Sequence, residues 1–279
     1  AEYAYKANDP STDNGFIYKN GEALFLQTAY SQKGFGLVLS AKRNDNMSFR
    51  SDRSEGLQNL LINYLPALTK QHTYNLLATL HPYAVQLNGE VAFQADLIYK
   101  FKKGTVLGGK YGMDIQINYA TANNIDTTIL NDETGSRLGY ESDYFKIGEV
   151  YFKDFNATLT KKFSSKIKGR FTYANLVYNK DIIEGKPGAA TVFSNVGIAD
   201  LTYKFNRKSS IRTEAQFLLT DQDQGGWGTF LLEYSYAPHW FIAVIDQYNF
   251  GNEDSDKQIH YLNGSVGYND KGTRVALNI

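Results

Sequence analysis

The feature that most constrains this chain is an alternation of apolar and polar side chains with a period of two residues. Side chains of a β-strand point alternately to its two faces, so this pattern predicts strands with one apolar and one polar face. The pattern recurs along most of the chain. In the stretch "FQADLIYKF", for example, Phe93, Ala95, Leu97, Tyr99 and Phe101 alternate with Gln94, Asp96, Ile98 and Lys100.

The apolar stretch Gly226–Phe250, "GWGTFLLEYSYAPHWFIAVIDQYNF", is as long as a membrane helix, but a Glu, a Pro and an Asp interrupt it. A two-residue turn at Ala237-Pro238 would fold it into a hairpin that pairs Tyr234 with Phe241. One face of this predicted hairpin is apolar and the other is mixed. The apolar face carries Phe230, Leu232, Tyr234, Tyr236, Phe241, Ala243 and Ile245, and the mixed face carries Glu233 and Asp246.

Short and long connections alternate between the predicted strands. The short turns fall near Ser31–Gly34, Lys102–Gly104, Ser164-Ser165, Asn206–Ser209, Ala237-Pro238 and Asn269–Gly272. The long connections are Asn44–Glu90, Thr121–Glu149, Asn179–Ala190, Asp221–Gly226 and Gly251–Lys257. We therefore predict an all-β fold, a transmembrane antiparallel up-and-down β-barrel with about 12–14 strands, short periplasmic turns and long external loops. Residues 1–279 would form this single domain.

A soluble β-sandwich or a lipocalin-like barrel would show the same alternation but would turn its apolar face inward. Three features favour the membrane. Strands of about 9–11 residues match a tilted span. Tyr and Phe often stand at the ends of the apolar faces, as in the aromatic girdles of membrane barrels. The alternation of connection lengths is not typical of a Greek-key sandwich.

The composition argues against several other classes of protein. The 29 basic and 29 acidic side chains give a formal net charge of zero, whereas a nucleic-acid partner needs a basic surface. The chain has no cysteine, so neither a disulfide framework nor thiolate chemistry is expected. Mean hydropathy is −0.41. No run approaches the roughly 18 uncharged apolar residues of a membrane helix.

No motif predicts an enzyme, a cofactor or a bound metal. The stretch Gly104–Tyr111, "GTVLGGKY", lacks the Ser or Thr that follows the lysine of a phosphate-binding loop, and a strand is expected after it instead of a helix. The four histidines lack the spacing of metal ligands. The acidic loops Leu219–Gly226 and Gly251–Lys257 could hold calcium, but without the regular ligand spacing of a dedicated site, solvated loops are the favoured interpretation.

Charged residues on the polar strand faces are predicted to face the barrel lumen. They are mixed in sign, so they predict either a wet, weakly selective pore or a network of ion pairs that plugs the barrel. The predicted lumen-facing residues are Asp96, Lys100, Lys110, Asp114, Lys168, Arg170, Asp200, Lys204, Arg212, Glu214, Glu233, Asp246 and Arg274.

The connection Asn44–Glu90 is too long to be featureless. A short amphipathic helix is predicted within it, because several apolar residues have helical spacing before Pro66. In this long external loop of residues 44–90, the helix would fold over the barrel mouth, and a partner-binding face is the alternative. The residues at helical spacing are Leu57, Leu60, Leu61, Tyr64 and Leu65.

The predicted strand number raises the question of closure. Six hairpins give about twelve strands, and Glu2–Ala7 could add one more, whereas a single-chain antiparallel barrel closes with an even number. An open sheet edge is not tolerated in lipid. Additional polypeptide that completes the wall is the favoured interpretation. The alternative is that Glu22–Tyr30 pairs directly with Thr273–Ile279.

Five motifs resemble those of an uncharacterised outer-membrane β-barrel family of the Bacteroides phylum, a domain of unknown function. The resemblance covers nearly the whole chain and implies a barrel in the outer membrane of a Gram-negative bacterium, without an assigned activity. It also implies that members continue beyond this chain, which would be their C-terminal half without its end. The motifs are "DNMSFRSDR" (Asp45–Arg53), "INYLPALTKQHTY" (Ile62–Tyr74), "HPYAVQLNGE" (His81–Glu90), "LGGKYG" (Leu107–Gly112) and "HWFIAVIDQYNFGN" (His239–Asn252).

Two functions fit these expectations. One is a porin-like channel or a barrel subunit of an outer-membrane complex. The alternative is a non-conducting structural or assembly subunit docked to secretion, uptake or surface-lipoprotein machinery. The expected partners are outer-membrane lipid, lipopolysaccharide, and other outer-membrane or lipoprotein subunits. Neither an enzyme activity nor a cofactor is expected.

Overall fold

The alternating pattern folds into one antiparallel sheet. The computed structural model describes residues 1–56, 59–130 and 135–279. In these residues thirteen strands pair in chain order, so the predicted all-β, antiparallel up-and-down fold is confirmed. The strands are β1 (Glu2–Lys6), β2 (Gly21–Gln32), β3 (Phe35–Asp45), β4 (Gly89–Phe101), β5 (Met113–Ile129), β6 (Tyr140–Lys162), β7 (Ile167–Asn179), β8 (Thr191–Lys204), β9 (Ser209–Leu219), β10 (Trp227–Tyr236), β11 (Trp240–Tyr248), β12 (His260–Asp270) and β13 (Thr273–Asn278).

Helices contribute little to the fold. The α-helices of the described residues are α1 (Asn75–Thr79) and α2 (Lys180–Glu184), and short 3-10 turns occur at Thr12–Asn14 and Ser255–Lys257. In the part of the chain that the structure describes, no helix is long and apolar enough to cross a membrane.

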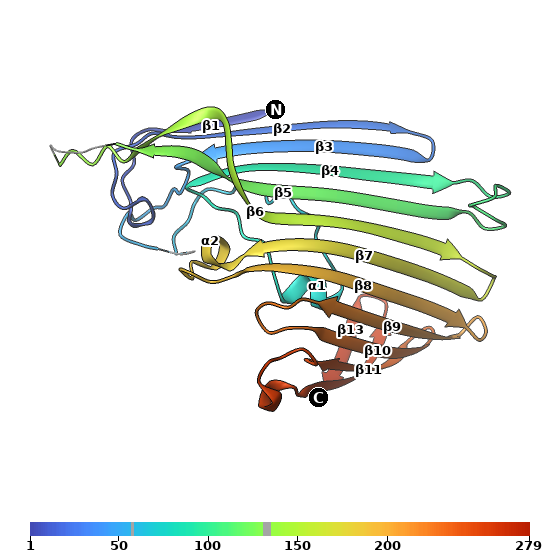
Figure 1. Cartoon of the computed structure of the whole chain (residues 1–279). Coiled ribbons are helices and arrows are strands. Elements are labelled where there is room, and N and C mark those ends of the chain that lie inside the picture. Colours follow the sequence, from blue (N-terminus) through green and yellow to red (C-terminus); the bar gives the residue numbers. More distant parts are fainter. Residues whose placement is uncertain (57–58, 131–134) are drawn as a thin grey trace.

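The sheet curves along its strand order (Figure 1). In that view β13 lies behind β9–β11, and α1 lies on the concave side, where it contacts β9 and β10. Neighbouring strands of a sheet are rotated relative to one another, and this rotation accumulates into curvature over many strands. We call the concave face of the sheet its inner face and the convex face its outer face.

The sheet is not closed among the described residues. β1 pairs with β2 and β13 pairs with β12, and these two strands form its edges. β2 is paired on both sides, with β1 and with β3, so the alternative pairing of Glu22–Tyr30 with Thr273–Ile279 is not formed. That additional polypeptide completes the wall stays a prediction.

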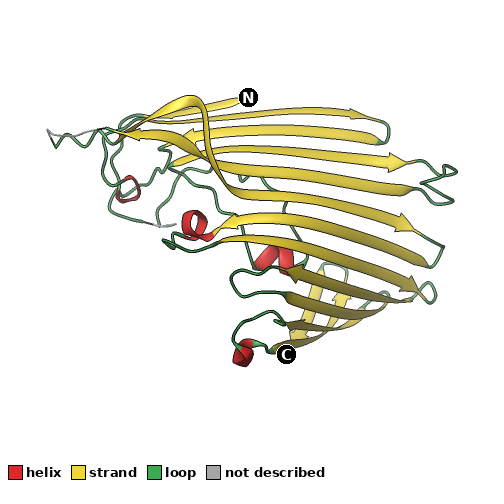
Figure 2. Ribbon diagram, in the orientation of Figure 1, coloured by secondary structure: helices red, strands yellow, loops and turns green. Residues whose placement is uncertain are grey.

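The connections alternate between two opposite ends of the sheet, as Figure 2 shows. The predicted alternation of short and long lengths does not hold throughout, since the connection 102–112 at one end is longer than 220–226 at the other. We call these ends the turn end and the loop end. The turn end comprises residues 33–34, 102–112, 163–166, 205–208, 237–239 and 271–272. The loop end comprises residues 7–20, 46–56, 59–88, 130, 135–139, 180–190, 220–226 and 249–259.

One predicted strand begins later than its pattern indicates. The strand expected after the predicted turn Lys102–Gly104 begins only at Met113, because a glycine-rich turn occupies residues 102–112. In that turn the Thr105 hydroxyl donates to the Lys102 carbonyl and accepts from the Gly108 amide. A Cβ at Gly108 would lie 2.0 Å from the Lys102 carbonyl oxygen, so only glycine permits this approach.

The predicted long connection Thr121–Glu149 is wrong, because β5 and β6 continue to pair as far as Ile129 and Tyr140. β-branched residues in "IDTTI" favour an extended chain. Register shifts along this part of the ladder bend the hairpin. Its end lies over β3, where the Tyr140 hydroxyl donates to the Asp45 carboxylate at 2.6 Å.

The helix predicted from Leu57 to Leu65 is wrong over its described residues 59–65; Leu57 lies outside the described residues. Leu61 instead forms a β-bridge with Arg50, and the Ile62 amide donates to the Phe49 carbonyl at 3.0 Å. Leu60 has a φ of +51°, which a right-handed helix excludes. The helix of this connection is α1, further along the chain.

The apolar core lies between the inner face and residues 46–88, which we call the inner segment. Leu76 and Leu77 of α1 are buried against side chains of β7, β8, β9 and β10. Leu68 is buried in a second cluster with side chains of β4 to β8. The wall residues of the two clusters are Ala174, Leu176, Val196, Ile198, Leu218 and Trp227, and Ala92, Ala122, Tyr151, Phe152, Tyr178 and Val192.

The outer face leaves rows of large apolar side chains exposed. Phe93 is 40% exposed, Phe217 57%, Phe230 53% and Ile242 53%. Strand register places these rows side by side, for example Ala215 opposite Phe230 and Tyr234 opposite Ile242. The sheet therefore has a core on one face and bare apolar surface on the other.

Candidate functional site

The inner segment lies across the inner face and contacts strands from β3 to β11. Its polar side chains meet buried polar side chains of the wall in three clusters. These clusters bring together residues that are far apart in the sequence. They form the candidate functional site, and each is described in turn.

The first cluster surrounds Glu90 at the start of β4. Its carboxylate lies 2.8 Å from the Lys42 ammonium, and the two side chains are 0% and 1% exposed. The hydroxyls of Tyr83 and Tyr151 both donate to Glu90. The Lys42 ammonium also donates to the Pro66 carbonyl at 2.7 Å. This buried ion pair therefore holds the inner segment at Pro66 and Tyr83.

The second cluster surrounds Asp154 of β6, which is 0% exposed. The His72 imidazole Nε2 lies 2.7 Å from its carboxylate, and the Lys70 ammonium donates to the neighbouring Asn156 at 2.7 Å. Burial lowers the pKa of Lys70, while the negative charge of Asp154 opposes this shift. The wall continues the network, because Asn156 donates to Asn118 at 3.1 Å.

The third cluster joins α1 to β9, β8 and β11. The Leu76 amide donates to the Gln216 side chain at 3.1 Å, and Gln216 is 0% exposed. The Tyr74 hydroxyl donates to Asp200 at 3.4 Å. Asn75 donates to Gln247 of β11. A helix of one turn leaves most of its backbone groups without helical partners, and these wall contacts satisfy part of them.

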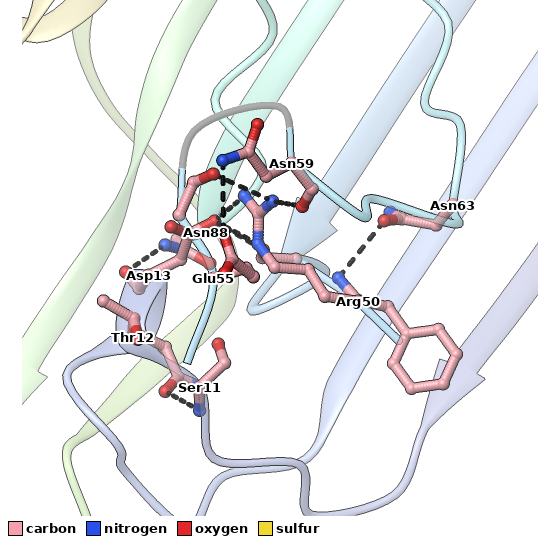
Figure 3. Close-up of polar contacts among 12 residues, drawn as sticks. Ser11, Thr12, Asp13, Arg50, Glu55, Asn59, Asn63 and Asn88 are labelled. Carbon is pink, nitrogen blue, oxygen red and sulfur yellow. Dashed lines mark hydrogen bonds and ion pairs between the residues drawn. The ribbon is translucent and has the colours of Figure 1, made fainter. Parts of the chain in front are cut away.

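An arginine cluster at the loop end holds the first part of the inner segment (Figure 3). The Arg50 Nε donates to the Asp13 carboxylate at 3.1 Å, and a guanidinium nitrogen donates to the Asn59 carbonyl. Asn88, just before β4, donates to the Asp13 carbonyl at 2.7 Å. Both ends of the inner segment are therefore tied to the connection between β1 and β2.

His81 lies between the last part of the inner segment and two other loops. Its Nε2 lies 3.5 Å from Asp223, and Asp223 is also paired with Lys180 of α2 at 2.5 Å. The imidazole packs 5.2 Å from the ring of Tyr178. Burial lowers the pKa of His81, which the negative charge of Asp223 partly opposes. The neutral imidazole is the form that this site favours.

Strand register places most of the predicted lumen-facing residues on the inner face. Among them, Arg212 lies 3.1 Å from Asp200 and also contacts Glu214, beside the third cluster. Lys100 lies 3.8 Å from Asp114 nearer the turn end. That this face lines a lumen stays a prediction. The residues on it are Asp96, Lys100, Asp114, Lys168, Arg170, Asp200, Lys204, Arg212, Glu214, Glu233 and Arg274.

Lys110 was predicted to lie on a wall strand, and this prediction is wrong. It lies in the glycine-rich turn 102–112 at the turn end, with its ammonium 5.7 Å from the ring centre of Tyr111. Lys110 was predicted to lie on this strand because the strand was expected to begin soon after the turn Lys102–Gly104. The glycines of this stretch favour a turn instead, since they adopt turn conformations that strand residues do not.

Asp246 lies on the outer face, opposite Phe230, and its predicted inward position is wrong. The turn has three residues, Ala237 to His239, so Tyr236 pairs with Trp240 instead of His239. A shift of one residue exchanges the two faces of the whole strand. Phe241, Ala243 and Ile245 are thereby moved to the inner face, and Trp240, Ile242 and Val244 to the outer face.

The most deeply buried charged groups of the site were not among the predicted residues. Lys42, Glu90 and Asp154 all lie on wall strands, but their positions fell in predicted polar faces or connections without a distinguishing motif. Their partners are Pro66, Tyr83, Tyr151 and His72, up to 82 residues away. A charged residue within an apolar stretch was the available signal, and it does not identify the partner.

The contacts in these clusters fix the inner segment to the wall and do not have the geometry of a catalytic site. Asp154 accepts from both His72 and Thr69, at 2.7 and 3.4 Å. A nucleophilic hydroxyl would have to bond to the histidine instead, so this is not the arrangement of a catalytic triad. In the described ranges, no group of three or more histidine or acidic side chains could hold a metal ion.

Comparison with known proteins adds a family. The sequence model of a family of unknown function, DUF6029, matches residues 1–279. The chain belongs to this family. Membership confirms the predicted resemblance to a family of unknown function, whereas the Bacteroides phylum and the relation to a longer protein stay predictions. No relative among curated proteins matches the chain.

Two similar solved structures are porins. One, "KdgM porin", is 10% identical, with 90% of this chain and 93% of the other covered and a TM-score of 0.30. The other, "KdgM porin in complex with disordered oligogalacturonate", is 10% identical, with 96% of each chain covered and a TM-score of 0.27. These scores are too low to support conclusions about this protein, so its fold rests on the strand pairing described above.

Proposed function

We propose that this protein is an outer-membrane β-barrel protein of a Gram-negative bacterium and that its own inner segment obstructs the space inside the sheet. It acts as a non-conducting structural or assembly subunit. Its lipid-facing surface is the outer face, and its partners are outer-membrane lipid, lipopolysaccharide and other outer-membrane or lipoprotein subunits.

The bare apolar outer face carries the membrane assignment. Soluble proteins rarely expose a continuous apolar patch of more than a few hundred Å². Here large apolar side chains are exposed on neighbouring strands around the whole curve, from Leu39 through Phe93 and Tyr173 to Phe217, Leu232 and Val244. The strands β2 to β12 pair on both sides, which satisfies their backbone groups as a hydrocarbon environment requires, whereas β1 and β13 pair on one side only.

The position of the inner segment supports a non-conducting role. Buried polar contacts tie it to the wall at Lys42, at Asp154 and at Gln216. Leu76 and Leu77 of this segment are 1% and 4% exposed against the wall. Opening a path along the inner face would therefore require breaking charged hydrogen bonds and exposing apolar surface at the same time.

A porin-like channel is the second candidate, because charged groups near the turn end of the inner face remain accessible. The Lys100 side chain is 69% exposed and that of Asp114 is 39% exposed. Mixed charges of this kind would line a wet, weakly selective passage. Such a passage requires that the inner segment moves.

Single-channel recording in planar lipid bilayers tests the proposal. The full-length protein is compared with a variant in which a short Gly/Ser linker replaces residues 48–86. We expect no stable conductance steps from the parent protein and ohmic steps from the variant, because the linker removes the clusters around Asp154 and Gln216. A linker of the same kind in place of residues 251–257 is the matched control and should leave the protein closed.

Resistance of the folded barrel to dissociation in detergent gels verifies that each variant is folded. Stable steps from the parent protein, unchanged in size by the deletion, would contradict the obstructing role and favour the porin-like channel. A parent protein that stays folded and soluble without detergent or lipid would contradict the membrane assignment itself.

A further inference from the structure

The turns at the turn end carry only one sign of charge. The six connections there contain eight lysines and arginines but not a single Asp or Glu. By contrast, the loop end holds many acidic residues, for example in "TDQDQGG" and "GNEDSDK". The chain as a whole is neutral, so this separation is a property of the fold. The eight residues are Lys33, Lys102, Lys103, Lys110, Lys166, Arg207, Lys208 and Lys271.

Carboxylates do not neutralise these turn cations. Within the described part of the chain, the ion pairs involve other basic residues, such as Lys42, Arg50, Lys180 and Arg212. The acidic residues nearest to the turns in sequence, Asp114 and Asp270, pair with Lys100 and His239. The turn end therefore presents a positive surface, and its field acts over about a Debye length, roughly 8–10 Å.

On the inner side of the turn end, an open pocket of about 570 Å³ lies between the ends of β6–β10, and its lining residues Lys204, Ser210 and Ser235 belong to the inner face. Lys166, Lys204, Arg207 and Lys208 line it, together with small polar residues that include Ser165, Ser209 and Ser210. No carboxylate lies among its lining residues. Ammonium, guanidinium and hydroxyl groups are the donors that bind phosphate oxygens.

Aromatic side chains stand on the outer face next to these turns. Tyr203 and Phe205 pack edge to face with 5.0 Å between ring centres, directly before Arg207. Tyr236 and Trp240, which flank the turn 237–239, are 48% and 53% exposed. In membrane barrels, such girdles mark the level at which hydrocarbon gives way to headgroups. The turn cations therefore lie at the height of the headgroup phosphates.

We propose that the turn end binds the phosphate groups of anionic phospholipids in the leaflet that surrounds it. This inference rests on the proposed membrane location and adds a lipid class and a face to it. The turn cations contact the headgroups, while the aromatic girdle fixes their depth. Each basic side chain near a membrane surface attracts anionic lipid by about 1 kcal/mol, a factor of about five.

The test measures lipid selectivity of the full-length protein in phosphatidylcholine bilayers with spin-labelled phosphatidylglycerol and phosphatidylcholine as competing probes. We expect phosphatidylglycerol to associate about fivefold more strongly, the effect of one such charge for each bound headgroup. The selectivity should fall in the variant Lys166→Gln, Arg207→Gln, Lys208→Gln and Lys271→Gln, which removes half of the eight turn cations. The matched control changes four exposed cations away from the turn end, Arg53→Gln, Lys146→Gln, Lys186→Gln and Lys257→Gln, and should keep the selectivity.

Three results would overturn the inference. These are no preference for phosphatidylglycerol in the parent protein, an unchanged preference in the turn-end variant, or an equal loss of preference in the control. Free phosphate is separated from lipid phosphate by replacing chloride with inorganic phosphate at equal ionic strength, since selective loss in phosphate would indicate a site for the free ion. A protein that leaves neutral phosphatidylcholine bilayers altogether would instead refute the membrane location.

Discussion

The two faces of this sheet are built from the same strands but have opposite surroundings. On β4, Glu90 and Ala92 of the inner face are 0% exposed, whereas Phe93 of the outer face is 40% exposed. On β9, Gln216 is 0% exposed and its neighbour Phe217 is 57% exposed. Side chains are buried here where the inner segment covers them, whether they are apolar or polar. In water the exposed apolar side chains of the outer face would be unfavourable, whereas in lipid they would meet an apolar environment.

The comparison also separates two kinds of stabilisation. The inner face depends on specific partners, because a buried charge without one costs several kcal/mol. The outer face depends on its surroundings, because lipid accepts any apolar side chain but not a charge. Substitutions on the two faces should therefore fail for different reasons.

The largest effect is expected at the inner ion pair. Lys42→Ala leaves the fully buried Glu90 carboxylate without its cation, which should lower the free energy of unfolding by about 3–5 kcal/mol. Urea unfolding of the protein in lipid vesicles measures this loss. Adding Glu90→Gln should recover much of it, because a neutral side chain still accepts from Tyr83 and Tyr151.

Lys146→Ala is the control for this ion pair, since Lys146 pairs with Asp126 and Asp143 but its side chain is 66% exposed. Exposed pairs contribute little to stability. If Lys42→Ala were as stable as Lys146→Ala, the cluster around Glu90 would not hold the inner segment.

The next effect distinguishes the faces on adjacent residues. Leu97 lies on the outer face between Leu37 and Ile117, and Ile98 lies on the inner face. Leu97→Arg should destabilise the assembled protein by about 2–4 kcal/mol near the bilayer centre. Ile98→Arg should be tolerated, because Ile98 is 50% exposed on the polar side. Recovery of folded protein from membranes measures both, and equal loss would contradict the assignment of the faces.

The strand pattern made much of this arrangement predictable. Residues of the set Phe93–Phe101, and Arg212 and Glu214 of β9, lie on the predicted faces because alternation follows directly from backbone geometry. The exceptions come from connections. A turn of three residues instead of two exchanges the faces of β11 and moves Asp246 outward. Glycines in the turn 102–112 remove Lys110 from the strand.

The contacts of the inner segment could not be predicted in the same way. His72 meets Asp154 across 82 residues, and Leu76 meets Gln216 across 140. Such pairs depend on the path of a segment without regular structure, which has no period to analyse. The helical spacing from Leu57 to Leu65 was also misleading, because nearby backbone groups at Phe49 and Ser51 offer bridge partners instead.

The smallest effect concerns His81, which lies in the inner segment 3.5 Å from Asp223 at the loop end. Burial lowers its pKa in the folded protein below the unfolded value of about 6.5, so below that pH the unfolded chain binds more protons. Stability from this site is therefore fully present above about pH 6.5 and falls as the pH drops toward the folded pKa, by at most about 1.4 kcal/mol per pH unit for one proton. His81→Gln should flatten that part of the stability profile between about pH 7 and pH 5, measured by urea unfolding. His260→Gln should keep it, because His81 is still present. An unchanged slope in His81→Gln would show that the buried His81 imidazole is not the group that titrates in this range.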